Sequence, residues 1–348
     1  MSIGSVTPVG KGFQVKNCAK QSNEGENVES LISTLEDKSR SLDDRREAIN
    51  ELTDLAQTNI PLNLVTKIVN ALIRGLRDEE IRGDSLYRLC NLISLDTIPL
   101  DLKLRMVDPL LRVLRDEESW EGAAEALGDI AGLEDIPDDV ADKIVSSLLT
   151  KMYRSVEYEY EDFPICDANF DCHDVRGREP NIDQVTIIAE ILVRLPESVR
   201  MRFSVPQVIV LWRPIQAWLD PAARPNTPNT YAYDLTLLVL RMPEDVDFTQ
   251  LYIEDADGER YEQNCLNEND PNCYGEFRGE RVFICGIGGS NGAVNCEVGL
   301  GLNGFRIFLN TNNSRARAYL SFYRKDEEGR IIPLGRSAPF YINNPDAE

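Results

Sequence analysis

The first candidates for chemistry are one histidine and two cysteines that lie close together. His173 is the single histidine of the chain; it follows Cys172, and Cys166 lies slightly upstream. Imidazole and thiolate groups are zinc ligands, but a structural zinc site takes four of them, and this spacing matches no standard zinc module. One histidine also excludes sites that need two or three imidazoles and leaves few acid–base schemes. We therefore expect no metal and no cofactor here.

A glycine-rich segment matches the sequence pattern of a serine nucleophile motif but lacks the context that the motif requires. Gly288-Gly289-Ser290-Asn291-Gly292 has the G-x-S-x-G pattern. That motif must lead into a helix, and its catalytic histidine follows the serine. Here Val294–Leu302 is strand-like and His173 lies upstream. We therefore expect no catalytic residue and no enzymatic activity.

Two further segments resemble ligand loops in part. Gly4 to Lys11 lacks the spacing of a phosphate-binding loop, and Gly12 stands where Ser or Thr is required. Asp255–Glu259 begins like a calcium loop, but its twelfth position is Leu266 instead of glutamate. A hairpin turn is the better interpretation of Asp255–Glu259.

Six cysteines fall into three close pairs, Cys166/Cys172, Cys265/Cys273 and Cys285/Cys296. Short pairs in loop-rich sequence are typical of local disulfides, which cytosolic thiol buffers normally prevent. Reduced thiols, a thermophilic host and a particle that leaves the cell without a signal peptide remain open.

The charge balance limits the partners. The chain has 37 basic and 59 acidic side chains, a formal net charge of −22. Such a surface repels nucleic-acid phosphates and anionic lipid and suits a protein partner with a basic surface. No stretch approaches the roughly 18 apolar residues of a membrane helix, and residues 1–27 lack the apolar core of a signal peptide. These features predict a cytoplasmic protein, with an extracellular particle as the alternative if the paired cysteines are oxidised.

A repeat of 38 residues organises the N-terminal half. Ile60-Pro61, Ile98-Pro99 and Ile136-Pro137 recur at that interval, and Leu76–Glu80 (Leu-Arg-Asp-Glu-Glu) returns as Leu114–Glu118. Apolar residues between these markers recur at three- and four-residue steps, which predicts two amphipathic helices per unit. Neither helix can bury its apolar face alone, so the units are expected to stack into a solenoid.

The segment Leu114–Ile130 resembles a HEAT-like (armadillo-like) repeat of the phycobilisome-lyase type, with an acidic turn, the small pair Ala123-Ala124 and then Leu127-Gly128. Residues 43–52 are similar, whereas the middle unit has Ser85-Leu86 in place of two alanines. The resemblance extends over about residues 28–219 and implies a protein-binding scaffold without lyase activity. In such solenoids the second helices line the concave surface. The residues that this places on a partner-binding face are Asp84, Arg88, Glu121, Glu125 and Asp129.

The pattern changes twice toward the C-terminus. Residues 154–180 form a long loop inserted in one hairpin, with an acidic tract in which Tyr158 and Tyr160 are candidate partner contacts. After a proline-rich linker at 220–230, short strand-like runs fill residues 231–348 and predict an antiparallel β-sandwich.

The expected architecture is an α+β multidomain chain. An extended arm at 1–27, which is predicted to support homo-oligomers, precedes the solenoid at 28–219 and the sandwich at 231–348. The expected function is a non-enzymatic scaffold or adaptor, and a structural subunit of a larger assembly is one form of it. The alternative is a β module that binds carbohydrate or calcium and is presented on a solenoid stalk.

Overall fold

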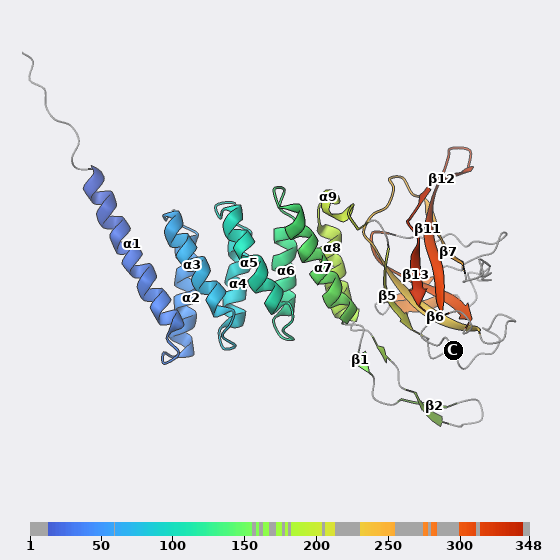
Figure 1. Ribbon diagram of the computed structural model, residues 1–348, viewed down its shortest axis with the longest axis horizontal. Helices are drawn as coiled ribbons and strands as arrows, with labels where there is room; N and C mark the ends of the chain where they lie inside the picture. Colours follow the sequence, from blue (N-terminus) through green and yellow to red (C-terminus); the bar gives the residue numbers. More distant parts are fainter. Residues whose placement is uncertain are drawn as a thin grey trace, which may run out of the picture. The chain divides into compact units, whose positions relative to one another are not determined.

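The computed structural model divides into two compact units, Met1–Val140 and Ala141–Glu348, and each is described by itself (Figure 1). The description covers residues 13–58, 60–154, 158–159, 163–166, 172–175, 178–179, 182–203, 206–212, 230–254, 274–277, 280–283, 299–310 and 314–343. Among these residues, no helix is both long enough and apolar enough to cross a membrane.

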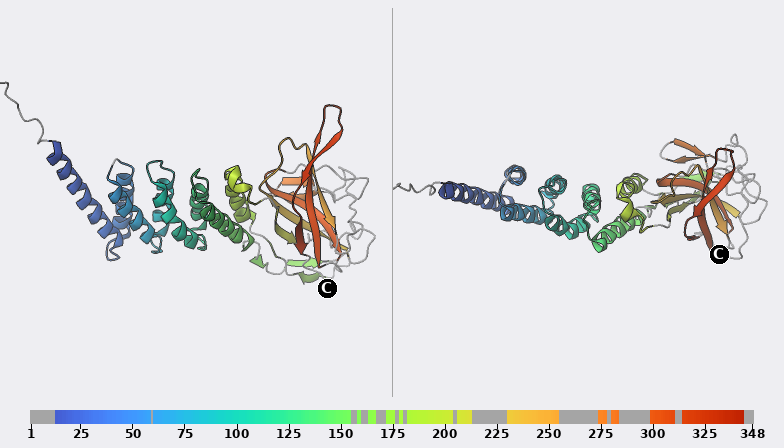
Figure 2. Two further views of the ribbon diagram at one scale, coloured as in Figure 1. Left: turned by 45° about the horizontal axis from the view of Figure 1, so that its top comes forward. Right: turned by 90° about the horizontal axis from the view of Figure 1, so that it is seen from above.

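The first unit consists of helices packed against one another in two layers. The helices are α1 (Phe13–Glu36), α2 (Leu42–Ala56), α3 (Leu62–Gly75), α4 (Arg82–Ile93), α5 (Leu100–Val113) and α6 (Trp120–Ala131). Odd-numbered helices contact one another in one layer and even-numbered helices contact one another in the other, as Figure 2 shows. This arrangement is compatible with a helical repeat.

The proline markers explain where the odd-numbered helices begin. Helices α3 and α5 start directly after Pro61 and Pro99, whose φ angles of −57° and −60° suit entry into a helix. Apolar residues spaced by three and four then form the buried face, as Val65, Ile68 and Leu72 do in α3. Burying each such side chain stabilises the fold by about 1.5–3 kcal/mol.

A buried arginine links the first two pairs of helices. Arg45 of α2 is 2% exposed; its Nε donates to the carbonyl of Leu35 (3.0 Å), and its Nη2 lies 2.6 Å from an oxygen of Asp78. Its Nη1 also donates to Glu80, at 3.1 Å. The hydrogen bond from Arg45 lowers the pKa of Asp78 below its ordinary value. The Asp-Glu-Glu turn therefore holds the preceding helix pair.

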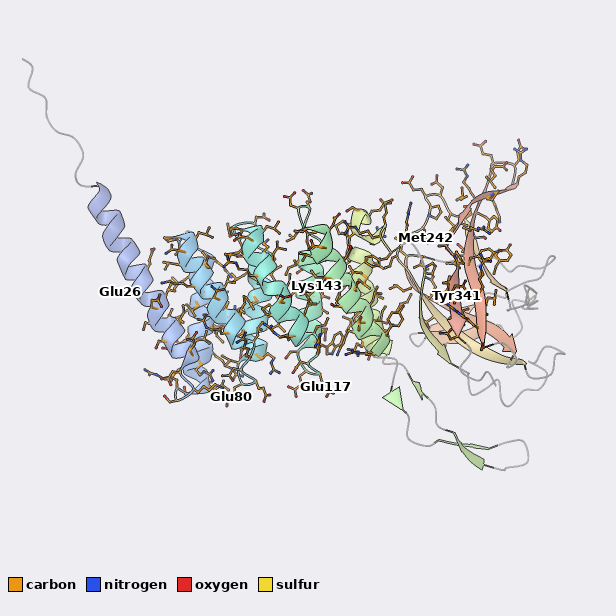
Figure 3. The ribbon with its side chains drawn as sticks, in the orientation of Figure 1. Glu26, Glu80, Glu117, Lys143, Met242 and Tyr341 are labelled. Atoms are coloured by element: carbon orange, nitrogen blue, oxygen red, sulfur yellow. The ribbon has the colours of Figure 1, made fainter. Side chains whose placement is uncertain are left out.

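Arg82, 37 residues after Arg45, repeats this device one step along the chain. Its Nε donates to the carbonyl of Leu76 (3.1 Å), and its Nη1 lies 2.6 Å from Asp116. Asp116 also accepts from the backbone of Glu118 and Ser119. Glu80 and Glu117, labelled in Figure 3, mark the two acidic turns in which these aspartates sit.

A glycine makes room for the serine that departs from the repeat pattern. Ser85 is fully buried, and a Cβ on Gly75 would lie 2.2 Å from its Oγ. The Ser85 Oγ has no hydrogen-bond partner. Helices α3 and α4 therefore approach closely at this point, because Gly75 has no side chain.

The second unit begins with further helices. Helix α7 (Asp138–Arg154) precedes two short ribbons, β1 (Tyr158–Glu159) with β4 (Arg178–Glu179) and β2 (Phe163–Cys166) with β3 (Cys172–Val175). Helices α8 (Ile182–Arg194) and α9 (Glu197–Arg200) follow. Arg200 ties α9 to the strands, since it donates to the carbonyls of Leu195 (2.9 Å) and Leu240 (3.0 Å).

Antiparallel strand pairs and sheets follow in the described part of the second unit. Strands β5 (Gln207–Trp212), β6 (Thr230–Val239) and β10 (Gly301–Asn310) are ordered β10-β6-β5. Strand β11 (Arg315–Lys325) pairs with β7 (Phe248–Glu254), β12 (Ile331–Arg336) and β13 (Phe340–Asn343). Strands β8 (Tyr274–Phe277) and β9 (Glu280–Phe283) form a separate pair.

Alternating residues of both larger sheets share one hydrophobic core. Leu235 and Leu237 of β6 contribute from one sheet, and Ile253 of β7, Leu320 of β11 and Ile342 of β13 contribute from the other. The alternation of buried and exposed residues along β13 is the period-two pattern of a half-buried strand.

The structure differs from the predicted boundaries in two places. Residues 13–27, expected within an extended arm, belong to α1. Residues 207–212, expected within the helical region, form β5, which pairs with β6. The run Val208–Leu211 is rich in β-branched residues and suits a strand, and Pro206, which resembles the markers of the helical repeat, precedes a strand here. The remaining domain boundaries stay predictions.

We predict that Arg45→Ala destabilises the first unit by about 3 kcal/mol, because it leaves the largely buried Asp78 carboxylate without its main partner. Arg46→Ala is the matched control; Arg46 pairs with Asp84 at 2.9 Å, both side chains are well exposed, and its loss is expected to cost less than about 1 kcal/mol. Denaturant unfolding of both variants measures the difference. Equal losses would contradict a structural role specific to Arg45.

We predict that Gly75→Ala costs about 1–3 kcal/mol through overpacking against Ser85. Gly83→Ala is the control, because a Cβ at Gly83 meets nothing within 4 Å. Alanine is favoured over glycine in a helix by up to about 1 kcal/mol, so Gly83→Ala should be neutral or stabilising. Thermal unfolding followed by circular dichroism compares the two, and a stabilised Gly75→Ala variant would show that the α3–α4 contact is not tight.

Candidate functional site

The even-numbered layer carries all five residues that the sequence placed on a partner-binding face. Asp84 and Arg88 lie one turn apart on α4, and Glu121, Glu125 and Asp129 follow one another at four-residue steps on α6. Residues four apart share one side of a helix, so each set forms one row. Helices α4 and α6 contact each other, which brings the two rows into one layer.

Asp84 and Arg88 are occupied by contacts to α2. Asp84 accepts from Arg46 Nε at 2.9 Å, and Arg88 Nη2 donates to the side-chain oxygen of Asn50 at 2.6 Å. Each pair joins residues that are 38 apart in the sequence. These two side chains therefore connect adjacent helices, and any partner would meet them as preformed pairs.

An exposed tyrosine between these two residues was missed in the sequence. Tyr87 is 61% exposed on α4, and the Arg88 guanidinium carbon lies 5.2 Å from the centre of its ring. A cation over an aromatic face orients both groups. The available signal was a large aromatic residue on the polar side of an otherwise regular amphipathic helix.

Cys90 connects the α4 row to the carboxylates of α6. It is half-buried and free, and its Sγ lies 3.6 Å from the carbonyl oxygen of Gly122 on α6. Burial raises the pKa of the Cys90 thiol to about 11, and the charges of Asp129 and Glu125 add to this effect. The α6 carboxylates are therefore close enough to α4 to raise the pKa of a thiol on that helix.

The remaining candidates belong to the second unit or lie outside the described residues. Tyr158 is opposite Glu179 in the β1–β4 ribbon, and Tyr160 is outside the described part of the chain. Cys166 and Cys172 are direct partners in the register of β2 and β3, and His173 is opposite Ile165. The other four paired cysteines, Cys265, Cys273, Cys285 and Cys296, are outside the described residues, as is Ser290. Disulfide and thiol interpretations both stay open.

The described residues do not form a metal centre. Within these parts of the chain, no group of three or more His, Cys, Asp and Glu residues is arranged to hold a metal ion. The chemistry that the even-numbered layer offers is noncovalent recognition, by carboxylates, a guanidinium group and an aromatic ring.

We predict that Cys90 resists alkylation at pH 8, because with a pKa of about 11 only about one thousandth of the thiol is ionised and the thiolate is the nucleophile. Iodoacetamide labelling of the Cys90 peptide, followed by mass spectrometry, measures the rate. The same chain unfolded in denaturant is the control and should react far faster. Asp129→Asn should raise the rate in the folded chain, since it removes one of the charges that disfavour the thiolate. Equal rates for folded and unfolded chains would contradict the assigned environment.

The comparisons with known proteins add no relative. No protein-family model matches the chain, and no curated protein matches it either.

Proposed function

We propose that this chain is a non-enzymatic scaffold or adaptor that binds a protein partner through the even-numbered layer of its helical region. In this proposal the helices form a HEAT-like α-solenoid and the C-terminal sheets form a β-sandwich. Hydrogen bonds and ion pairs between residues 38 apart support the solenoid. The core shared by the two larger sheets supports the sandwich.

The observation that carries the proposal is the exposed Tyr87 beside Arg88. Tyrosine and arginine are the residue types enriched at energetic centres of protein interfaces. Tyr87 is held on a regular helix whose opposite side is fully buried, as Leu86 and Leu89 show. A rigid aromatic side chain loses little conformational entropy when a partner covers it.

The surrounding charges favour a partner with a basic surface. Glu121, Glu125 and Asp129 project from the neighbouring helix, and Asp84 lies one turn before Arg88. The net charge of −22 strengthens long-range attraction of a cationic surface and accelerates its encounter. The same charge disfavours nucleic acid.

The second function raised by the sequence is a carbohydrate- or calcium-binding β module. The segment Asp255–Glu259, which begins like a calcium loop, lies outside the described residues. That function stays a prediction.

We predict that a photo-crosslinking amino acid at position 87 captures a protein partner in cells that make this chain. Tyr87→Ala should then weaken binding of the captured partner by about tenfold or more, the loss expected for an interface centre. Position 62 on α3 is the matched control, since Leu62 is also exposed, at 54%, but lies in the other layer.

Glu121→Lys should slow association with the same partner and reduce its dependence on salt. Thermal unfolding of each variant separates lost binding from lost structure. Capture from position 62 instead of position 87, or unchanged affinity of Tyr87→Ala, would refute the assigned face.

A further inference from the structure

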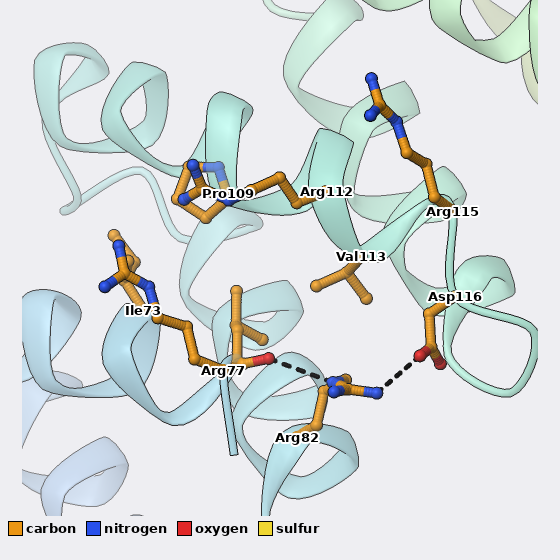
Figure 4. Close-up of a pocket in the computed structure, with 9 residues that line it drawn as sticks. Ile73, Arg77, Arg82, Pro109, Arg112, Val113, Arg115 and Asp116 are labelled. Carbon is orange, nitrogen blue, oxygen red and sulfur yellow. Dashed lines mark hydrogen bonds and ion pairs between the residues drawn. The ribbon is translucent and has the colours of Figure 1, made fainter. Parts of the chain in front are cut away.

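A groove between α3 and α5, in the odd-numbered layer, is lined by arginines. Its volume is about 340 Å³. The residues that line it are Ile73, Leu76, Arg77, Arg82, Pro109, Arg112, Val113, Arg115 and Asp116 (Figure 4). Four arginines and one aspartate therefore line the groove beside apolar side chains, in a chain whose overall charge is strongly negative.

The acid that lines the groove is already engaged. Figure 4 shows Arg82 joined to Asp116 and to the carbonyl of Leu76. Asp116 also accepts hydrogen bonds from the backbone of the following turn. Burial raises the pKa of Asp116, but the backbone hydrogen bond from Ser119, the charge of Arg82 and the backbone hydrogen bond from Glu118 together hold this pKa below its ordinary value. Asp116 is therefore ionised at neutral pH and is already paired with Arg82.

The other three arginines are available to a ligand. Arg77, Arg112 and Arg115 are exposed. Among the described residues, none of the three has a carboxylate within ion-pair distance. Their guanidinium groups carry donors suited to bidentate recognition of carboxylates.

The repeat register explains why these cations lack acids. Helix α1 is joined to α3 by ion pairs between residues 38 apart, Glu29 with Lys67 and Glu36 with Arg74. At the same step, Lys67 and Arg74 of α3 correspond to Arg105 and Arg112 of α5, so α3 offers no acid to α5 at these positions. The α1–α3 junction therefore joins opposite charges, whereas Arg112 has no acid at the corresponding position of α3.

An exposed arginine without an acid partner can pair with a carboxylate of a ligand instead. An anion bound in the groove would supply the negative charge that α3 does not. The apolar side chains of Ile73, Pro109 and Val113 add a surface that inorganic anions cannot use.

We propose that the α3–α5 groove binds an acidic peptide segment of a partner protein. Carboxylates of the segment pair with Arg77, Arg112 and Arg115, and an apolar side chain between them packs on the groove floor. A short acidic segment satisfies the local charge without contacting the acidic remainder of the surface. An extended nucleic acid carries a phosphate charge about every 1.7 Å of duplex and would meet that repulsive remainder. This site is separate from the Tyr87 face and does not depend on it.

The test is fluorescence anisotropy of the full chain with a short, end-capped peptide of alternating glutamate and leucine. Arg112→Gln and Arg115→Gln together should weaken binding by about tenfold or more, as expected for lost hydrogen bonds to charged groups. Arg105→Gln is the matched control, because Arg105 is an exposed cation on the same helix that does not line the groove. It should change affinity by less than about threefold, an effect expected of an exposed charge outside the contact.

The same assay contains the outcomes that would overturn the proposal. An equal loss of peptide affinity in Arg105→Gln would show that binding depends only on the overall positive charge of this surface. Equal binding of a glutamine–leucine peptide would exclude carboxylate recognition. Tighter binding of inorganic phosphate, or of a single-stranded oligonucleotide, would assign the groove to a free anion or to nucleic acid instead. Tyr87→Ala should leave peptide binding unchanged, which separates this site from the proposed scaffold face.

Discussion

The helical region depends on one register, in which residues of adjacent same-layer helices that are 38 apart in the sequence lie side by side. A polar residue that points along the layer must therefore match the residue one step later. Glu36 with Arg74 and Arg46 with Asp84 satisfy this requirement. The constraint also determines where the charge pattern fails, since Arg112 follows Arg74 at the same step. Opposite charges at positions 38 apart stabilise the stack of helices. A charged residue without an opposite charge at that step is left to pair with a ligand.

Much of the helical arrangement was readable from the sequence, because prolines and apolar spacing act locally. The Ile-Pro markers give the starts of α3, α5 and α7 to within a residue. The burial of Arg45 was not readable, because its partner Asp78 lies in the turn of the next unit and the two are 33 residues apart. Strand β5 was missed for a related reason: its partner β6 follows only after residues 213–229, and periodicity alone does not distinguish a short apolar run in a strand from one in a helix.

The candidate site was predicted only in outline. Sequence reasoning selected charged residues on the second helices because such residues are solvated, and the structure does place them in one layer. It did not show that Asp84 and Arg88 are held by α2, since that requires pairing each residue with its counterpart one step away. Tyr87 was overlooked because an aromatic residue in a helix is usually counted as core. The arginine groove depends on two helices at once, so no single-helix pattern reveals it.

The two proposed surfaces lie on different layers and have opposite character. The even-numbered layer presents carboxylates around Tyr87, and the odd-numbered layer presents arginines around an apolar groove. A partner that carries both a basic surface and an acidic segment would engage both layers, and its two attachments would raise each other's effective concentration. A partner with only one of these features would bind more weakly. Local charge reversal in an acidic chain therefore favours selectivity, because the long-range field attracts cationic surfaces while the groove admits only a short anionic segment.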